Sequence, residues 1–254
     1  MQILTKDASV TLYNASFNET YHNSNDGALQ ETLHKHILPA FALKKQQQHL
    51  KILDICFGLG LNALCAFHHL KELAFLGEVI LHSPEIDTAL LLLLKNHSYP
   101  KELEFSKQVI NALQKQQEYH NNSFHLYLHL GEAREILKGF LKNGNQGFDI
   151  IFQDPFSPLK NHTLWTFEYF KILYALSSDD VVITTYSHNS SMLYSAFLAG
   201  FYAFKLVQKD VRDSVILTKT QVLPDLDLEC VERVVRINME HKIKTNPKLK
   251  GLYD

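Results

Sequence analysis

The stretch LDICFGLGLNAL, residues 53 to 64, decides the fold. Its first part reads as an apolar strand, and its last part is a helical run that begins after Gly58 and Gly60. These glycines let the backbone turn tightly and let a ligand approach the helix start without a Cβ in the way. The string GLGLNA fits the nucleotide-site pattern G-x-G-x-x-G/A, although many such strings are only tight turns. Whether this string is a nucleotide-binding loop or only a tight turn has to be judged from the strands and helices around it.

Short apolar strands alternate with helical stretches on both sides of this turn. Strands are expected at 51–55, 78–82, 124–130, 148–153, 180–186, 201–208 and 213–220, and helices at 60–73, 85–97, 132–141, 167–176 and 190–200. The alternation predicts a mostly parallel sheet with helices on both faces. The last two strands have no helix between them, so they should form an antiparallel hairpin at one sheet edge. Seven strands with this closing hairpin indicate an α/β, Rossmann-like sheet of the class I S-adenosylmethionine (SAM)-dependent methyltransferase type.

The alternating region, residues 49–221, is the expected methyltransferase domain, and residues 1–48 form a small N-terminal extension that should pack on it. Within the domain, residues 99–122 are rich in Lys, Gln and Glu, which predicts a helical, exposed insertion. The C-terminal tail, residues 222–254, begins acidic and ends basic. The pattern leaves open whether this tail docks as a helix or stays mobile.

Composition narrows the class of protein. The chain has 254 residues, of which 46% are hydrophobic and 20% charged, so wholesale disorder is excluded. A net charge of -2 gives no global attraction to nucleic acid, and a polyanion would have to use a local patch. The three cysteines have no paired spacing and the fourteen histidines no ligand spacing, so neither a disulfide framework nor a metal site is indicated. With no signal peptide or membrane-spanning run in the sequence, a cytoplasmic location is the default expectation.

Acids at the ends of two strands suit either SAM or a nicotinamide cofactor, and the acid ahead of the glycines together with the closing hairpin favours SAM. Asp54 lies four residues before Gly58, where an acid can hold the amino-acid end of SAM, and Glu85 ends the second strand, where it can bind a ribose diol. Asp87 is a second candidate for the ribose, or an acid at a helix N-terminus. Glu132 follows the third strand and either approaches the adenine or sits in the first turn of a helix.

The stretch QDPFSPLKNHTLW, residues 153 to 165, ends the fourth strand on Asp154. A turn would explain the two prolines, but the carboxyl edge of the sheet is also where an α/β cofactor crevice lies. A carboxylate there can orient an amine, accept its proton, and stabilise the charge that grows on nitrogen during methyl transfer. Pro155 and Phe156 would fix the conformation of the loop and form one side of the amine-binding site.

Longer motifs resemble the bacterial methylaminomethyl-thiouridine tRNA methyltransferases, found as half of bifunctional MnmC enzymes and as stand-alone MnmD proteins. DPFSPLKN followed by TLW is similar to D-x-F-A/S-P-x-K-N-P-x-x-W, and LDICFGLGLN to the E-x-G-F-G-x-G-L-N cofactor loop. HLGEAREIL is similar to the family's F-G-D-a-x-x-x-L segment, and FNETYHNSNDGALQETLHKHIL to D/N-E-x-Y-H-S…GA-x-x-E-S/T-x-H-V-F. The departures include Cys56 for glycine, Asp54 for glutamate, Glu132 for aspartate and His162 for proline.

The resemblance implies methyl transfer from SAM to the amine of 5-aminomethyl-(2-thio)uridine at the tRNA wobble position. It places Asp154 and Phe156 at the amine, and these residues at the cofactor: Glu31, Asp54, Phe57, Gly58, Gly60, Asn62, Glu85 and Glu132. It places Tyr21, Pro155, Lys160, Asn161 and Trp165 at the substrate.

The implied partner is the anticodon region of tRNA. A basic patch from Lys160, Lys205, Lys209, Arg212 and the Lys-rich tail would meet its phosphates. No FAD oxidoreductase half is expected, so a separate enzyme would supply the aminomethyl uridine. Two alternatives stay open: a methyl or aminopropyl transferase acting on a small amine, and a SAM- or tRNA-binding protein without catalysis.

Overall fold

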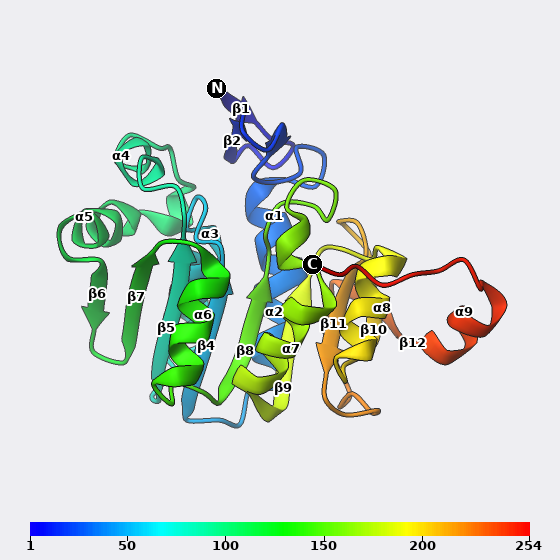
Figure 1. Cartoon of the computed structure of the whole chain (residues 1–254). Coiled ribbons are helices and arrows are strands. Elements are labelled where there is room, and N and C mark those ends of the chain that lie inside the picture. The colour runs from blue at the N-terminus through cyan, green and yellow to red at the C-terminus, as the bar shows by residue number, and fades with distance from the viewer.

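The strands and helices predicted after residue 49 form one large mixed sheet with helices on both faces (Figure 1). The computed structural model describes all residues, 1–254. The strands of this sheet are β4 His49–Ile55, β5 Glu78–Glu85, β6 Glu118–Asn121, β7 Phe124–Leu130, β8 Phe148–Gln153, β9 Ser177–Thr185, β10 Tyr202–Gln208, β11 Ser214–Thr218 and β12 Val231–Ile237.

The helices in this part of the chain are α3 Leu61–Glu72, α4 Leu90–Leu94, α5 Ser106–Gln116, α6 Ala133–Lys142, α7 Phe167–Leu176, α8 Ser190–Leu198 and α9 Met239–Thr245. Two short 3₁₀ turns, η2 Lys101–Leu103 and η3 His162–Leu164, complete it. None of these helices, nor any other in the structure, combines the length and apolar character that crossing a bilayer requires.

The main sheet has nine strands, in the order β12-β10-β11-β9-β8-β4-β5-β7-β6, where seven were predicted. The five central strands, β7, β5, β4, β8 and β9, are parallel, as expected. The predicted β10–β11 hairpin is antiparallel, but it is not at the edge: β11 pairs with β9, and β12 covers β10. The mostly parallel methyltransferase-type sheet is therefore correct, and the strand count is wrong by two edge strands.

Both additional strands lie where the sequence is polar. β6 falls inside the insertion at 99–122 and pairs antiparallel with β7 across a turn in which Asn122 has φ 39. β12 lies in the tail and leaves most of its side chains exposed or half-buried. Edge strands bury little surface, so they lack the apolar signal of a central strand. The predicted helix in the insertion is present as α5, but only one of its faces is exposed, because the other buries Val109, Ile110 and Leu113.

Residues alternate between two apolar cores along the central strands. In β4, Leu50 and Ile52 belong to a core of 32 buried residues shared with α3 and α5, whereas Leu53 and Ile55 belong to a core of 23 shared with α6, α7 and α8. Two-sided burial explains why the central strands were readable from the sequence as continuous apolar runs.

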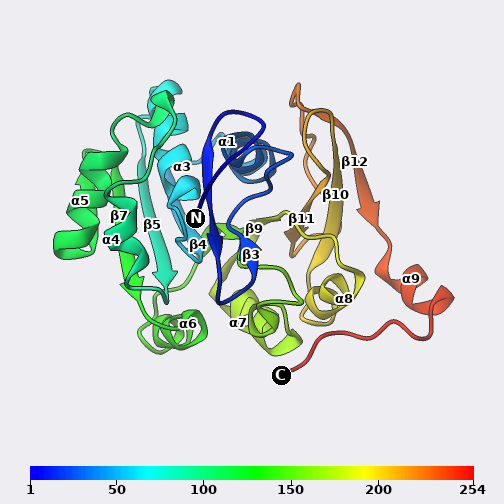
Figure 2. The same ribbon diagram turned by 90° about the horizontal axis from the view of Figure 1, so that it is seen from above.

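The N-terminal extension builds a second, small sheet and a helical run. The sheet consists of β1 Gln2–Leu4, β2 Val10–Asn14 and β3 Glu19–Thr20, and the run of α1 Ala28–Thr32, the π-helical segment η1 Leu33–Ile37 and α2 Leu38–Leu43. The side chain of Asp7 accepts a hydrogen bond from the Gln30 backbone N–H at 2.9 Å, which ties the small sheet to the start of α1. Figures 1 and 2 show this sheet above the ends of the central strands.

Candidate active site

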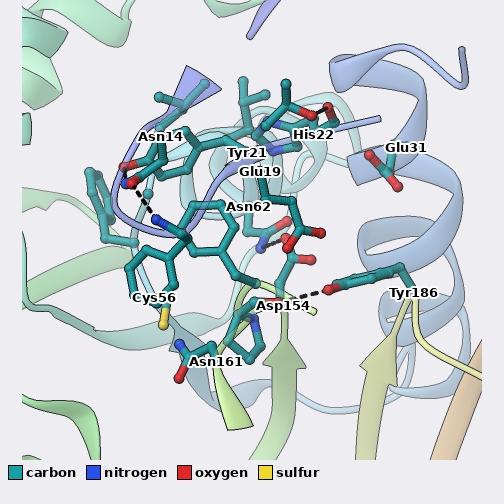
Figure 3. Close-up of a pocket in the computed structure, with 18 of the residues that line it drawn as sticks. Asn14, Glu19, Tyr21, His22, Glu31, Cys56, Asn62, Asp154, Asn161 and Tyr186 are labelled. Carbon is teal, nitrogen blue, oxygen red and sulfur yellow. Dashed lines mark hydrogen bonds between the residues drawn. The ribbon is translucent and has the colours of Figure 1, made fainter. Parts of the chain in front are cut away.

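A pocket opens at the carboxyl ends of β5, β4, β8 and β9, beneath the small N-terminal sheet (Figure 3). The main domain contributes Cys56, Phe57, Gly58, Leu59, Leu61, Asn62, Glu85, Ile86, Asp87, Asp154, Pro155, Phe156, Asn161, Tyr186 and Arg212. The N-terminal extension contributes Asn14, Phe17, Glu19, Thr20, Tyr21, His22, Asn23 and Glu31. The pocket is therefore enclosed by two regions that are far apart in the sequence.

The turn between β4 and α3 has the left-handed backbone that its glycines permit. Gly58 has φ 53 and Gly60 φ 75, and a Cβ on Gly60 would come within 2.6 Å of the Phe57 ring. Cys56 also has a positive φ, 69. The left-handed region is costly for residues with a Cβ, which gives a physical reason for the glycine that the resembled motif has at position 56.

The Glu85 side chain holds this turn from the end of β5. One carboxylate oxygen accepts a hydrogen bond from the Gly58 N–H at 2.8 Å, and the other accepts one from the Asp87 N–H at 2.7 Å. Burial raises the pKa of Glu85 above its ordinary value, although these two backbone donors oppose the rise. Each carboxylate oxygen has a second lone pair, so Glu85 retains acceptor capacity for a hydroxyl in the pocket.

Asn62, in the first turn of α3, joins two acidic groups. Its amide nitrogen donates to Asp54 Oδ1 at 3.0 Å and to Asp154 Oδ2 at 3.1 Å. Asp54 is fully buried beneath the pocket, and burial raises its pKa well above the ordinary value. One side chain thus connects the strand that ends at the glycine turn with the strand that ends at Asp154.

The Asp154 carboxylate also faces two histidines from the N-terminal extension. Its Oδ1 lies 3.4 Å from Nε2 of His36, and His22 is near it in the pocket. Burial raises the pKa of Asp154, but His36, His22 and the Asn62 amide outweigh burial, so the pKa lies below its ordinary value. An ionised carboxylate at this point can bind a cationic or developing-cationic nitrogen.

Aromatic rings form the wall beside Asp154. Phe156 stacks on Phe17 with ring centroids 4.6 Å apart and lies 5.1 Å from the ring of Tyr21. The Tyr186 hydroxyl donates to the Pro155 carbonyl at 2.9 Å, and the Trp165 indole N–H donates to the Phe156 carbonyl at 2.8 Å. The loop after β8 is therefore fixed from both sides, with its Phe156 ring directed at the pocket.

The lining is rich in carboxylates. Besides Asp154, it includes Glu19, Glu31, Glu85 and Asp87, against one cationic side chain, Arg212. Arg212 lies 3.2 Å from Asp26, which is also paired at 2.7 Å with the buried Lys35. Lys35 binds Glu31 as well, at 2.8 Å. The acidic lining favours positively charged ligands over anionic ones.

Ten of the predicted site residues meet in this pocket: Tyr21, Glu31, Phe57, Gly58, Asn62, Glu85, Asp154, Pro155, Phe156 and Asn161. Five others do not line it. Asp54 lies beneath Asn62, and Gly60 supports the turn as the residue before α3. Lys160 is exposed, and Trp165 is fully buried behind the loop, where it packs near Tyr186 rather than facing the pocket.

Glu132, the fifth, caps α6 and accepts a hydrogen bond from the Glu135 N–H at 3.0 Å. This contact agrees with the alternative that Glu132 belongs to the start of a helix. His162, which stands where the resembled motif has proline, has its Nε2 2.9 Å from the Tyr253 carbonyl. The C-terminal segment thus holds the loop at the point where a proline is missing.

Sequence reasoning missed several lining residues. Tyr186 could have been found, because it directly follows β9, as Asp154 follows β8. Glu19 stands at the glutamate of the resembled D/N-E-x-Y-H motif and could have been found there. Asn14 and Phe17 carried no signal, since nothing in a polar N-terminal segment indicates that it folds over a distant strand end. The only sequence signal for His36 was its helical spacing to residues that are buried.

The lining fits SAM. The Asn62 side-chain oxygen is buried and has no hydrogen-bond partner, so an ammonium group in the pocket would satisfy it. Gly58 and Tyr21 both line the pocket, and a Cβ on Gly58 would lie only 3.2 Å from the Tyr21 ring. Glu85 adds acceptors for a ribose at the end of β5, the usual place in this type of sheet.

Comparison with known proteins points to the same cofactor. A family model described as S-adenosyl-L-methionine-dependent methyltransferase matches residues 98–211. The crystal structure of MnmC2 from Aquifex aeolicus superposes with a TM-score of 0.80 at 26% sequence identity, and the match covers 100% of this chain and 78% of that one. These similarities confirm the predicted fold class and the predicted cofactor.

Two curated relatives extend the comparison. An uncharacterised protein of Methanocaldococcus jannaschii is 28% identical over 186 residues, which is 72% of this chain and 49% of the relative. The tRNA 5-methylaminomethyl-2-thiouridine biosynthesis bifunctional protein MnmC of Pseudomonas entomophila is 26% identical over 203 residues, 74% of this chain and 30% of the relative. The chain thus spans half or less of the length of these relatives.

Proposed function

We propose that the chain, which is similar to MnmC2 and MnmC proteins and matches a SAM-dependent methyltransferase family model, methylates an amine on tRNA. The substrate is the exocyclic amine of 5-aminomethyl-(2-thio)uridine at the wobble position, and the product is the 5-methylaminomethyl form. The observation that carries the proposal is Asp154. Its carboxylate lies in the pocket, and the Asn62 side-chain amide bridges it to Asp54, which lies in the strand that precedes the glycine turn.

Asp154 has two tasks in this reaction. It orients the amine by accepting a hydrogen bond, and it stabilises the positive charge that develops on nitrogen. The pKa below the ordinary value makes Asp154 a weak base, so charge stabilisation outweighs proton removal among its tasks. SAM, when bound, supplies the electrophilic methyl group. Its proposed binding residues are Glu31, Asp54, Phe57, Gly58, Gly60, Asn62, Glu85 and Glu132.

The aromatic wall suits a pyrimidine. Phe156, Phe17 and Tyr21 present ring faces and edges beside the carboxylate, and a flat base gains from stacking there. Burial raises the pKa of Tyr21 to about 12, so its hydroxyl stays neutral and does not add to the acidic lining. Pro155 and Asn161 complete this side of the pocket, and Trp165 supports it from behind.

The tRNA backbone needs a different surface, since phosphates would be repelled by the carboxylates in the pocket. Lys160 is exposed on the loop next to the pocket, β12 carries exposed Arg233 and Arg236, and α9 carries exposed Lys244. Lys205 is paired with Asp213 and Arg212 with Asp26. We therefore assign the phosphate contacts to Lys160 and to the basic residues of the tail. Lys205 and Arg212 are less suited to this role, because each is already paired with a carboxylate. The aminomethyl uridine itself would come from another enzyme.

The test is methyl transfer from labelled SAM to tRNA that carries 5-aminomethyluridine, followed by nucleoside analysis. The expected result is 5-methylaminomethyluridine in that tRNA and no labelled nucleoside in tRNA lacking the aminomethyl group. Asp154→Asn should lower kcat by about a hundredfold or more, as removal of one charge-stabilising group does. Transfer at the wild-type rate by Asp154→Asn would remove Asp154 from the mechanism, and absence of any transfer would refute the proposed substrate.

A second candidate function is transfer of a methyl or aminopropyl group to a small amine. The five carboxylates in the pocket favour it, because a polyamine is a compact polycation. The same assay separates the two functions. Product formed from a free polyamine, at a rate that tRNA does not alter, would favour the small-amine reaction.

A further inference from the structure

His36 reaches Asp154 from an unusual backbone segment. It lies in η1, where five residues in a π-helical conformation interrupt the α1–α2 run. Such insertions are uncommon and are often found at functional sites. The resembled N-terminal motif ends in Val-Phe, whereas this chain has Lys35 and His36 at those two positions. Lys35 is accounted for by its bonds to Asp26 and Glu31, which leaves His36 to be explained.

The His36 imidazole is fully buried, at 1% exposure, between two polar groups. Its Nδ1 lies 2.9 Å from Oγ1 of Thr184 in β9, and its Nε2 lies 3.4 Å from Asp154 Oδ1. Nε2 makes no hydrogen bond in this structure, and the facing acceptor is this Asp154 oxygen. If the Thr184 hydroxyl donates to Nδ1, the proton of a neutral imidazole is on Nε2 and points to Asp154.

The two carboxylate oxygens of Asp154 thus have different neighbours. Oδ1 faces the buried His36 Nε2 at 3.4 Å, and Oδ2 accepts a hydrogen bond from the Asn62 amide, so the two neighbours lie on opposite sides of the carboxylate. A carboxylate with a donor at each oxygen would be fixed in one rotamer and kept ionised despite burial. The 3.4 Å separation is long for a hydrogen bond, and contacts of this kind commonly shorten when substrate is bound.

We propose that His36 is the positioning residue for Asp154: its Nε2–H fixes the carboxylate in the rotamer that faces the amine and keeps it charged. The proposal rests on the proposed function, and it adds to it a residue from the N-terminal extension. Thr184 in turn fixes the tautomer of His36, so the chain Thr184–His36–Asp154 runs from the sheet to the reacting nitrogen.

Other charged or titratable groups near the pair are His22, Glu31 and Lys35 from the N-terminal extension, and Asp54, Cys56 and Tyr186 from the strand ends. None of these is within hydrogen-bond distance of His36 Nε2. Loss of the imidazole therefore leaves burial of Asp154 opposed by fewer groups, and the pKa of its carboxyl must rise.

The experiment compares His36→Phe, His36→Gln and the wild type as full-length proteins. The Phe variant has the residue of the resembled motif, and the Gln variant keeps an N–H donor at the Nε2 position. With 5-aminomethyl tRNA, His36→Phe should lower kcat roughly tenfold to a hundredfold, the loss expected for one hydrogen bond to a charged group. KM for SAM should change less than twofold. The acid limb of the kcat profile should move to higher pH, and His36→Gln should recover most of the rate.

A measurement without turnover separates this proposal from the proposed function. In protein labelled with ¹³C at aspartate carboxyls, the Asp154 resonance should titrate at higher pH in His36→Phe than in the wild type. His120→Phe, at an exposed position on β6, is the matched control and should leave both the titration and the rate unchanged. If the wild type methylates no tRNA but the Asp154 titration moves as expected, the function is wrong and the pairing stands. An unchanged Asp154 titration, or equal loss of rate in the Phe and Gln variants, would overturn the positioning role.

Discussion

The two walls of the pocket are built by different means. The sheet wall consists of the loops after β4, β5, β8 and β9, and the N-terminal wall consists of residues 14–31. The turn of the sheet wall has backbone–backbone bonds in addition to the Glu85 contact: the Phe57 N–H donates to the Pro84 carbonyl at 3.0 Å, and the Gly60 N–H donates to the Phe57 carbonyl at 2.7 Å. The N-terminal wall is held by side chains, as where Glu19 accepts from the Ser157 hydroxyl at 2.9 Å and Lys35 binds Glu31. Backbone-held geometry tolerates side-chain changes, whereas the N-terminal wall depends on particular charges.

The largest effect is expected from Lys35→Met, which removes the cation of the N-terminal wall. Lys35 is 1% exposed and pairs with both Asp26 and Glu31, so its loss leaves buried carboxylates without a counter-charge. Breaking a buried ion pair in this way costs about 3–5 kcal/mol. Denaturant unfolding measures the loss. The matched control is Lys44→Met, because Lys44 is equally buried but pairs with the exposed Asp180 and should cost less.

The Lys35 effect should also depend on pH. Burial raises the pKa of Asp26, but Lys35 and Arg212 outweigh burial and leave the pKa below its ordinary value. The stabilisation by the ionised form is therefore present above the unfolded pKa of about 3.9 and is lost as the pH falls through the lower folded value. Wild type and Lys35→Met should converge in unfolding free energy in strong acid. A difference that does not change between pH 7 and pH 3 would show that Lys35 acts through packing.

The next largest effect is expected from Asn62→Ala in the sheet wall. The substitution removes the donor shared by Asp54 and Asp154, and leaves Asp54 with the Ser83 hydroxyl at 3.3 Å and Asp154 with His36 at 3.4 Å. The affinity for SAM and kcat should both fall, together by about a hundredfold in kcat/KM, since two hydrogen bonds to charged groups are lost. Calorimetric titration with SAM and steady-state kinetics measure the two parts. A fall in kcat with unchanged SAM affinity would show that Asn62 acts on the methyl acceptor through Asp154 and does not contribute to SAM binding.

The difference between the walls also explains what could be predicted from the sequence. Gly58, Gly60 and Glu85 were identifiable because a strand, a turn and a helix within a few residues determine their positions. Asp154 was identifiable because it ends a buried strand. Phe17 and His36 were not, because their places depend on how residues 1–48 fold over strand ends more than a hundred residues away.

The same reasoning applies to the fold. The central strands bury both faces and read as apolar runs, so their order along the chain was correct. β6 and β12 lie at the edges, bury little, and have the polar composition of a loop. Trp165 was expected near the substrate from its motif, and its burial behind the loop depends on its packing against the distant Tyr186 ring, which no local pattern encodes.

A smaller effect is expected from Glu19→Ala in the N-terminal wall. Glu19 accepts hydrogen bonds from the Ser157 N–H at 3.2 Å and from its hydroxyl at 2.9 Å, which joins β3 to the loop after Asp154. Loss of this contact should raise KM for tRNA about fivefold, the equivalent of about 1 kcal/mol, and leave SAM affinity unchanged. Glu135→Ala, which removes an exposed carboxylate on α6, is the control and should change neither. A parallel loss of SAM affinity would mean that the N-terminal wall also shapes the cofactor site.

The smallest effect is expected at Cys56, and it tests whether the sheet wall is held by its backbone. Cys56 has φ 69, a conformation that costs about 1–2 kcal/mol for a residue with a Cβ. Burial raises the pKa of its thiol well above the ordinary range, so the group stays protonated and can be replaced without removing a charge. Cys56→Ala keeps the strain and Cys56→Gly relieves it, at an entropic cost of about 0.5–1 kcal/mol. The Gly variant should therefore unfold with a free energy roughly 0.5–1 kcal/mol above that of the Ala variant. The opposite order would mean that side-chain packing around the thiol, rather than the backbone, sets the turn, and that the sheet wall is held in the same way as the N-terminal wall.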